Sequence, residues 1–390
     1  MNIFVEADYL SLNKNNEELC GDKVEIIRTE NFVIVVLADG LGSGVKANIL
    51  STLTSKIIGT MISLGASIDE AVDTIINTLP VCNERGIAYS TFSILQIFNS
   101  GECYLAEFDN PSIIRLIKGR YVDINRQVRE INGKLIKESR FSIGTEDILV
   151  MVSDGAIHAG VGHILNLGWQ WENIKDYLVR IYRRDISAKN ISMLLLEVCD
   201  NLYAKKPGDD TTVVTVKVRN RLQVTVMIGP PVDKNMDKSV VRRFIEEEGK
   251  KVVCGGTTSQ IVSREINKEV VTSLNYFDRK VPPTAKIEGI DLTTEGILTM
   301  GEALEYAKKY VSSENTITDF LDLNKQDGAS RLAKLLIEDS TSVKFIVGRA
   351  INPAHQNPEF PLDLGIKLKL VGEMANCLKQ LGKKVTLEYF

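Results

Sequence analysis

The sequence predicts two domains of different fold class. Residues 1–219 are expected to form an α+β domain in which antiparallel sheets are layered and flanked by helices, because hairpin-like strand pairs alternate there with pairs of helical segments. Residues 220–390 are expected to form a separate α/β domain with a mostly parallel sheet, because single strands alternate with single helices. At 390 residues the chain is also too long for one ordinary hydrophobic core.

The strands of the first domain are short apolar runs joined by polar turns. Residues 24–28 and 32–38 predict one hairpin, with the tight connection Thr29-Glu30-Asn31 between them. Two further hairpins and a last strand are predicted at 90–98 with 102–108, 112–117 with 121–124, and 211–218.

Helices are predicted where apolar residues recur at helical spacing. The segment 45–64 carries such residues at Val45, Ile49, Leu53, Ile57, Met61 and Leu64. Further helices are expected at 67–79, 171–182 and 187–203, and a turn at 141–144.

In the second domain, strands and helices alternate. Strands are predicted at 224–228, 252–253, 342–347 and 384–389, and helices at 237–248, 260–266, 301–311, 326–339 and 364–382. The stretch Gly255-Gly256-Thr257-Thr258 is predicted as a turn between a strand and a helix.

Composition excludes several classes of function. Charged residues at 25% and apolar residues at 44% are ordinary for a soluble globular protein. The net charge of −4, without a basic tract, argues against a nucleic-acid partner. No apolar run approaches the ~18 residues of a membrane span, and the N-terminus lacks the pattern of a signal peptide. Six widely spaced cysteines without a CxxC pair predict neither zinc site nor disulfide framework. We therefore expect a cytoplasmic protein without membrane contact.

Carboxylates at strand ends are the chemically informative feature. Asp39-Gly40 ends the apolar run 32–38, Asp154-Gly155 ends a second run, and Asp209 and Asp210 open a third strand. A single Asp-Gly more often just begins a turn, but three acidic strand ends together with Asp22 favour one oxygen-lined metal site. Such ligands suit Mg²⁺ or Mn²⁺ and not zinc.

Six motifs follow one another in the first 218 residues. They are Gly21-Asp22, Ala38-Asp39-Gly40-Leu41-Gly42-Ser43-Gly44, Asn110-Pro111-Ser112, Ser142-Ile143-Gly144, Val150-Met151-Val152-Ser153-Asp154-Gly155, and Asp209-Asp210-Thr211-Thr212-Val213. In this order they resemble the metal-dependent serine/threonine protein phosphatases of the PPM (type 2C) class. Within that class they are similar to the phosphatase domain of stage II sporulation protein E (SpoIIE). The resemblance implies a PPM-type layered β-sandwich.

The resemblance also implies a centre of two Mn²⁺ or Mg²⁺ ions. Asp39 would bridge both ions, with Asp22 and the Gly40 carbonyl completing one and Asp154 and Asp209 the other. Asp39 and Asp154 are the expected catalytic positions. Asp210 takes the place of an asparagine found in many relatives and ranks below Asp209. Leu41 stands where many eukaryotic members carry a histidine thought to act as general acid.

The function that this resemblance implies is hydrolysis of phosphoserine or phosphothreonine on a partner protein, through a water that bridges the two ions. Residues 220–390 would regulate the enzyme. The related phosphatases also suggest a homodimer, and in the sporulation branch the two helices at 45–64 and 67–79 would act as a switch. The alternative is a non-catalytic phosphatase-fold sensor or scaffold whose C-terminal domain binds a small ligand or protein.

A second candidate site lies in the C-terminal domain. Gly255, Gly256, Thr257 and Thr258 precede a predicted helix, and free N–H groups at a helix start attract anions. The competing interpretation is a helix simply capped by Thr or Ser. Arg349, Asn352 and His355 could face the same crevice if the sheet is parallel.

Overall fold

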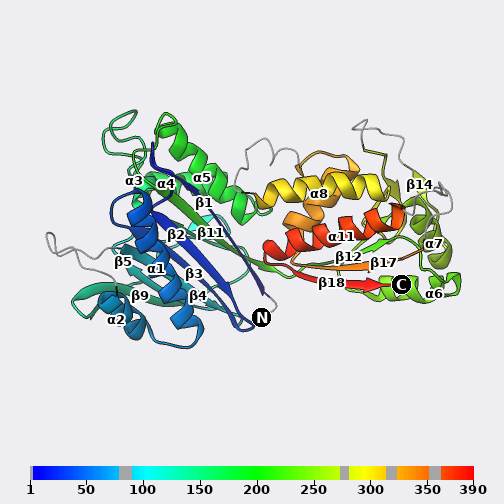
Figure 1. Cartoon of the computed structure of the whole chain (residues 1–390), viewed down its shortest axis with the longest axis horizontal. Helices are drawn as coiled ribbons and strands as arrows, with labels where there is room; N and C mark the ends of the chain where they lie inside the picture. Colours follow the sequence, from blue (N-terminus) through cyan, green and yellow to red (C-terminus); the bar gives the residue numbers. More distant parts are fainter. Residues whose placement is uncertain (1–2, 79–89, 273–280, 313–322, 351–361) are drawn as a thin grey trace. The chain divides into compact units, whose positions relative to one another are not determined.

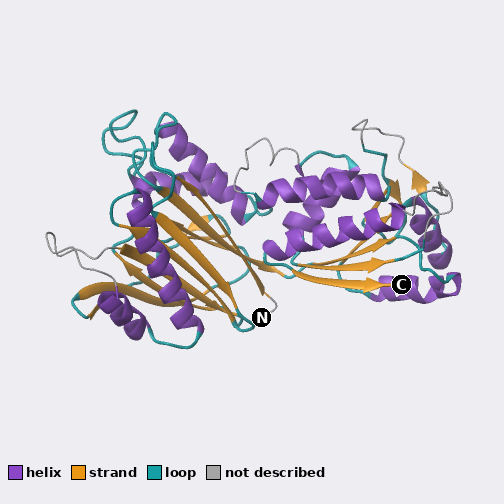
Figure 2. Ribbon diagram, in the orientation of Figure 1, coloured by secondary structure: helices purple, strands orange, loops and turns teal. Residues whose placement is uncertain are grey.

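A computed structural model describes residues 3–78, 90–272, 281–312, 323–350 and 362–390 of the chain. The chain divides into two compact units, Met1–Asn220 and Arg221–Phe390 (Figure 1). The first unit mixes antiparallel sheets with helices, and the second has a mostly parallel sheet flanked by helices (Figure 2). The predicted fold class, α+β followed by α/β, is confirmed.

The first unit contains two antiparallel sheets. One has six strands in the order β2-β3-β4-β5-β9-β8, and the other has five in the order β1-β11-β10-β6-β7. The hairpins predicted from the sequence are present as the pairs β2–β3, β4–β5 and β6–β7. The strands are β1 (Ile3–Leu12), β2 (Asp22–Arg28), β3 (Phe32–Gly40), β4 (Ser90–Phe98), β5 (Glu102–Phe108), β6 (Ile114–Ile117), β7 (Arg120–Tyr121), β8 (Gln127–Ile131), β9 (Lys134–Ser142), β10 (Asp147–Val152) and β11 (Thr211–Asn220).

Helices cover the outer faces of both sheets. Side chains of α1 and α2 pack with those of β3 and β4, while α4 and α5 pack on β10 and β11. A third cluster, which includes Leu37, Leu105 and Met151, fills the space between the sheets. The layers therefore run helix, sheet, sheet, helix. The helices are α1 (Gly44–Ser63), α2 (Ile68–Thr78), α3 (Asp154–Ile157), α4 (Trp171–Ile181) and α5 (Ala188–Leu202).

Two local features differ from the sequence-based expectation. Although 45–64 is helical as predicted, Val45, Ile49 and Leu53 are 62%, 53% and 43% exposed, so the first half of this apolar stripe does not face the sheet, whereas Ile57 and Met61 pack against it. The buried face of α1 instead alternates small and apolar residues, such as Ala47 and Leu50. The turn predicted at 141–144 lies later than expected, because β9 continues through Ser142 to pair with β5 and the turn begins at Gly144.

The second unit has a seven-stranded sheet in the order β14-β15-β16-β13-β12-β17-β18. The pairs β12–β13, β12–β17, β13–β16 and β17–β18 are parallel, as the alternation of strands and helices predicted. The strands are β12 (Gln223–Ile228), β13 (Lys250–Cys254), β14 (Val271–Thr272), β15 (Ala285–Lys286), β16 (Leu292–Thr294), β17 (Ser342–Val347) and β18 (Lys384–Tyr389).

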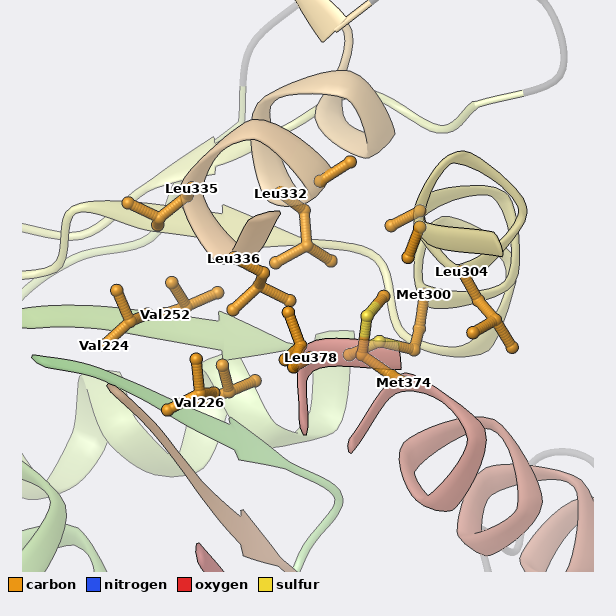
Figure 3. Close-up of a cluster of buried hydrophobic side chains, with 14 of the residues drawn as sticks. Val224, Val226, Val252, Met300, Leu304, Leu332, Leu335, Leu336, Met374 and Leu378 are labelled. Carbon is orange, nitrogen blue, oxygen red and sulfur yellow. The ribbon is translucent and has the colours of Figure 1, made fainter. Parts of the chain in front are cut away.

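Helices lie on both faces of this sheet. On one face, α8, α10 and α11 bury a cluster that includes Met300, Leu336 and Met374 (Figure 3), and on the other, α6 and α7 pack around Phe244. The helices are α6 (Asp237–Glu246), α7 (Gly256–Ile266), α8 (Ile297–Val311), α10 (Gly328–Lys334) and α11 (Leu362–Gln380), with short helical turns η1 (Lys234–Met236) and η2 (Leu335–Asp339). No helix within the described residues of either unit is long and apolar enough to cross a membrane.

The core between the two sheets sets the stability of the first unit. Leu105 is fully buried there, so we expect Leu105→Ala to lower the free energy of unfolding by about 2–5 kcal/mol. Leu135, on the neighbouring β9, is 62% exposed and gives a matched control, Leu135→Ala, with an expected change within about 0.5 kcal/mol. Urea denaturation of both variants measures the difference. Equal losses would contradict this placement of the core.

Candidate metal centre

Asp22 and Asp39 lie directly opposite each other on neighbouring strands. They are a register pair of the antiparallel β2–β3 ladder, and side chains of opposed residues project from the same face of a sheet. The N–H of Gly40 donates a hydrogen bond of 3.2 Å to the carbonyl of Gly21. This pairing holds the two predicted ligand segments together at one end of the six-stranded sheet.

Asp154 and Asp209 come from the other sheet. Asp154 opens α3 directly after β10, and Asp209 lies just before β11. The two segments are joined because the N–H of Ser153 donates to the Thr212 carbonyl (3.0 Å) and the N–H of Thr212 donates to Ser153 Oγ (2.8 Å). The four predicted carboxylates are thus delivered in two pairs, one from each sheet of the sandwich.

Glycines permit the close packing of these segments. A Cβ at Gly40 would overlap the backbone of Ala47 in α1, and a Cβ at Gly155 would overlap the carbonyl of Asp210. At Gly21 a Cβ would lie 2.7 Å from Asp210 Oδ2. Three of the Gly positions picked out in the motifs therefore matter because no side chain fits there.

The carboxylates act on one another electrostatically. Burial and, after it, the nearby carboxylates of Asp22, Asp154 and Asp209 together raise the pKa of Asp39 to about 10. Burial also raises the pKa of Asp22 to about 7, although the Ser153 and Thr212 hydroxyls oppose this rise. The pKa of Asp209 is raised by burial and by Asp154. The four predicted carboxylates are therefore close enough to influence one another's protonation.

Asp209 and Asp210 occupy different places in this centre. Asp209 is half-buried and is among the groups that raise the pKa of Asp39. Asp210 is buried and contributes instead to the raised pKa of Asp22 and of the Cys20 thiol. Its Oδ1 accepts a hydrogen bond of 3.0 Å from the N–H of Lys14. This arrangement favours Asp209 as the partner of Asp39 and Asp154.

The residues present fit a divalent cation in their chemistry. Both carboxylate oxygens of Asp22, and Oδ2 of Asp210, are buried without a partner at hydrogen-bond geometry, although the Ser153 and Thr212 hydroxyls act on Asp22 from nearby. Unpaired buried carboxylates are costly, and a cation would remove that cost. Within the described part of the chain, however, no three Asp, Glu, His or Cys side chains already stand in a metal-holding arrangement. Binding would therefore require the carboxylates to rotate toward a shared ion.

Lys14 is a site residue that the sequence analysis missed. Its Nζ lies 3.8 Å from Asp209 Oδ1, and its side chain is 38% exposed. The loop that carries it is fixed because the N–H of Asn15 donates to the Pro207 carbonyl (2.8 Å). Lys14 sits in a polar loop, LNKNNEEL, with no local signal that marks it. Only the tertiary fold brings it to the acidic strand ends.

The predicted anion site of the second unit has a different local structure from the one expected. Gly255, at φ +113°, precedes α7, so Gly256, Thr257 and Thr258 form the first turn of the helix and not a separate turn. Thr258 is buried and its Oγ1 accepts a hydrogen bond of 3.0 Å from the N–H of Gly229. The start of α7 has no side-chain cap. Arg349 is exposed after β17, while Asn352 and His355 lie outside the described residues. An anion at this position stays a prediction.

A two-sheet sandwich with carboxylates gathered from both sheets is the arrangement expected of a metal-dependent phosphatase of the PP2C type. The family comparison agrees, because residues 29–219 match the family model described as Stage II sporulation protein E (SpoIIE). The match spans most of the first unit and a little under half of the chain. Residues 29–219 therefore match the SpoIIE family that the motifs predicted. No curated protein matches the sequence.

Solved structures of bacterial phosphatases are similar to the chain at low identity. The PP2C phosphatase domain of SpoIIE from Bacillus subtilis, solved with a fragment of its regulatory domain, is 21% identical over 56% of this chain and 64% of that chain, with a TM-score of 0.48. The RsbU and RsbW domains of a Mycobacterium tuberculosis protein are 19% identical over 63% and 67%, with a TM-score of 0.46. RsbX in complex with magnesium is 19% identical over 55% and 95%, with a TM-score of 0.39. The chain spans less than two thirds of the first of these structures, and the assignment rests on the family match.

The buried carboxylates predict a pH dependence of stability in the metal-free protein. Because Asp22 has its pKa raised from 3.8 to about 7, the folded state holds this proton more tightly than the unfolded state does. Its contribution is complete below pH 3.8 and is lost as the pH rises through about 7. We expect the melting temperature in a chelator to fall over this range, and to fall less steeply in Asp22→Asn.

Asp185 is exposed and provides the control, Asp185→Asn, which should keep the wild-type slope. Because protons and cations compete for the same carboxylates, Mn²⁺ should raise the melting temperature more at pH 7.5 than at pH 5. An unchanged slope in Asp22→Asn would contradict the buried, unpaired state of this carboxylate.

Proposed function

We propose that this protein is a metal-dependent phosphatase that removes phosphate from phosphoserine or phosphothreonine on a partner protein. The observation that carries the proposal is the convergence of Asp22, Asp39, Asp154 and Asp209 from both sheets of a SpoIIE domain. Two Mn²⁺ or Mg²⁺ ions, when bound, would activate water for attack and neutralise charge on the phosphate. In this proposal the second unit regulates the enzyme or recruits its substrate.

The proposed role of each carboxylate follows from how deeply it is buried. Asp22 is 4% exposed, and its two oxygens, which lack hydrogen-bond partners, are suited to hold a cation in place of a proton. Asp39 interacts electrostatically with Asp22 and with the carboxylates of the other sheet, so in this proposal it would bridge the two ions. Asp154 is exposed at the mouth, where substrate would arrive, and the Gly40 carbonyl lies on the same strand end as Asp39. Leu41 is 39% exposed and cannot act as a general acid, so water would protonate the departing serine oxygen.

Lys14 is the proposed phosphate-seating residue. It is the cation that lowers the pKa of Asp209, and both side chains are partly exposed, at 38% and 41%. A phosphate ester carries negative charge that carboxylates would repel, so a neighbouring ammonium group would favour productive binding. This residue supplies the positive charge that the six motifs lack.

The alternative function, a phosphatase-fold sensor or scaffold, is favoured by one observation. The described Asp, Glu, His and Cys side chains do not form a ready-made metal-holding group. A scaffold would bind one ion weakly or none, whereas the phosphatase would bind two. Metal stoichiometry at equilibrium separates the two functions directly.

Loss of a predicted ligand should abolish turnover. We expect Asp39→Asn and Asp154→Asn each to lower Mn²⁺-dependent hydrolysis of p-nitrophenyl phosphate by about 100-fold or more. Mutation of a residue that only hydrogen-bonds to a metal ligand already lowers metal affinity or activity by about 10–100-fold, so loss of a ligand itself should cost at least as much. Asp185→Asn should retain wild-type turnover. Full activity in either ligand variant would refute the proposed centre, and absence of turnover in the wild-type chain would favour the scaffold.

Removal of the Lys14 charge should weaken substrate binding more than it slows the chemical step. We expect Lys14→Met to raise KM for p-nitrophenyl phosphate about tenfold, since a hydrogen bond to a charged group contributes about 1.5–3 kcal/mol. Lys206→Met removes an exposed charge from the adjacent loop and should leave KM within about twofold. Equal changes in both variants would indicate a general charge effect and no seating role for Lys14.

A further inference from the structure

A pocket of about 500 Å³ opens in the first unit beside the Asn110-Pro111-Ser112 motif. Its volume lies within the range of about 300–1,000 Å³ that is typical of ligand sites. Its lining combines apolar surface from Tyr121, Ile157 and Trp171 with the polar groups of Asn110 and Lys137. None of these residues belongs to the carboxylate centre, and the proposed reaction gives the Asn110 motif no role.

Two short connections place the pocket next to the carboxylate centre. Ile157 follows Asp154 by three residues in the helical turn α3, where residues at this spacing have Cβ atoms about 5–6 Å apart. On the other side, Thr91 donates a hydrogen bond to Asn110 Oδ1, and Thr91 is the register partner of Asp39 on β4. The pocket is therefore linked to Asp154 through Ile157 and to Asp39 through Thr91 and Asn110.

The aromatic wall of the pocket is held in place. Tyr121 and Trp171 pack edge to face, with ring centroids 5.7 Å apart and an interplanar angle of 83°. Trp171 Nε1 also donates a hydrogen bond of 2.7 Å to the carbonyl of Ser112. Rigid aromatic side chains of this kind bind a partner's apolar group at little cost in conformational entropy.

The charged groups of the pocket leave one cation available. Arg126 is committed to Glu107, with Nε to Oε2 at 2.6 Å. Asp123 accepts the hydroxyl hydrogen of Tyr121 (3.0 Å) and lies 3.7 Å from Arg126. Lys137 is exposed, and no carboxylate of the described residues forms an ion pair with it. The pocket thus offers an aromatic wall together with a free ammonium group.

We propose that this pocket binds the segment of the phosphoprotein that flanks the phosphorylated residue. The segment would place one large apolar or aromatic side chain against Trp171 and Tyr121 and one carboxylate at Lys137. An extended peptide advances about 3.3 Å per residue, so a chain with its phosphate over the centre reaches the pocket within about two residues. This specificity site rests on the proposed phosphatase function.

The test uses the full chain and three synthetic phosphoserine peptides. All three peptides share one host sequence. The same pair of residues stands directly before and directly after the phosphoserine, and this pair is Tyr-Glu, Tyr-Lys or Ala-Ala. The readout is the ratio of kcat/KM values between peptides, which cancels any general change in activity. We expect the wild type to prefer Tyr-Glu over Ala-Ala about tenfold, and Lys137→Glu to prefer Tyr-Lys over Tyr-Glu.

Arg120→Glu is the matched control, because Arg120 is exposed next to Tyr121 but does not line the pocket. It makes the same charge reversal and should keep the wild-type preference. A wild type that hydrolyses all three peptides equally would overturn the proposal. So would a Lys137→Glu variant with an unchanged order of preference.

Failure of the proposed function can be told apart from failure of the pocket. If the chain does not hydrolyse p-nitrophenyl phosphate with Mn²⁺, the phosphatase proposal fails, and binding of the same peptides is then measured by fluorescence anisotropy. Tighter binding of the Tyr-Glu peptide that is lost in Lys137→Glu supports the pocket. Equal binding of the three peptides overturns it.

Discussion

Mutual repulsion among closely spaced carboxylates is the constraint on which the first unit depends. Two sheets must deliver Asp22 with Asp39 and Asp154 with Asp209 to one place, against their own charge. The apolar core between the sheets lies directly behind these residues, and Leu37, two residues before Asp39, is fully buried in it. Burial of apolar surface thus offsets the electrostatic cost of the centre, and protons or cations relieve what remains.

The sequence predicted this centre because buried strands and their polar ends are local features. Apolar runs of strand length that stop at Asp39 and Asp154 identify both the strand and the candidate ligand. Lys14 could not be found in the same way, since its proximity to Asp209 depends on a contact between two loops far apart in the chain. The pocket at Asn110 was equally hidden, because its lining comes from five separate segments.

The differences in the fold have similar causes. Periodicity along α1 predicted a helix correctly but could not say which face the sheet would cover, and the sheet covers the face of Ala47 and Leu50. The strand β16 is only three residues long, so it carries too few residues to show a period. At Phe141 the ladder to β5 prevails over the local tendency of the following Ser-Ile-Gly to turn.

In the second unit, the loops at the point where the strand order reverses contact each other directly. The strand order reverses direction between β12 and β17, and parallel sheets commonly bind ligands at such a place. Here Gly348 approaches the carbonyls of Gly229 and Pro230, and the buried Lys367 donates a hydrogen bond of 2.5 Å to the Gly348 carbonyl. Backbone and lysine contacts therefore join the two loops that follow these strands.

The contact between Gly40 and Ala47 sets a limit on sequence change in the first unit. What blocks a larger residue at position 40 is the main chain of α1, which every substitution at position 47 would still possess. No second mutation in a side chain can therefore make room for the first. Position 40 is therefore restricted to glycine by a backbone contact alone, independently of any role of its carbonyl.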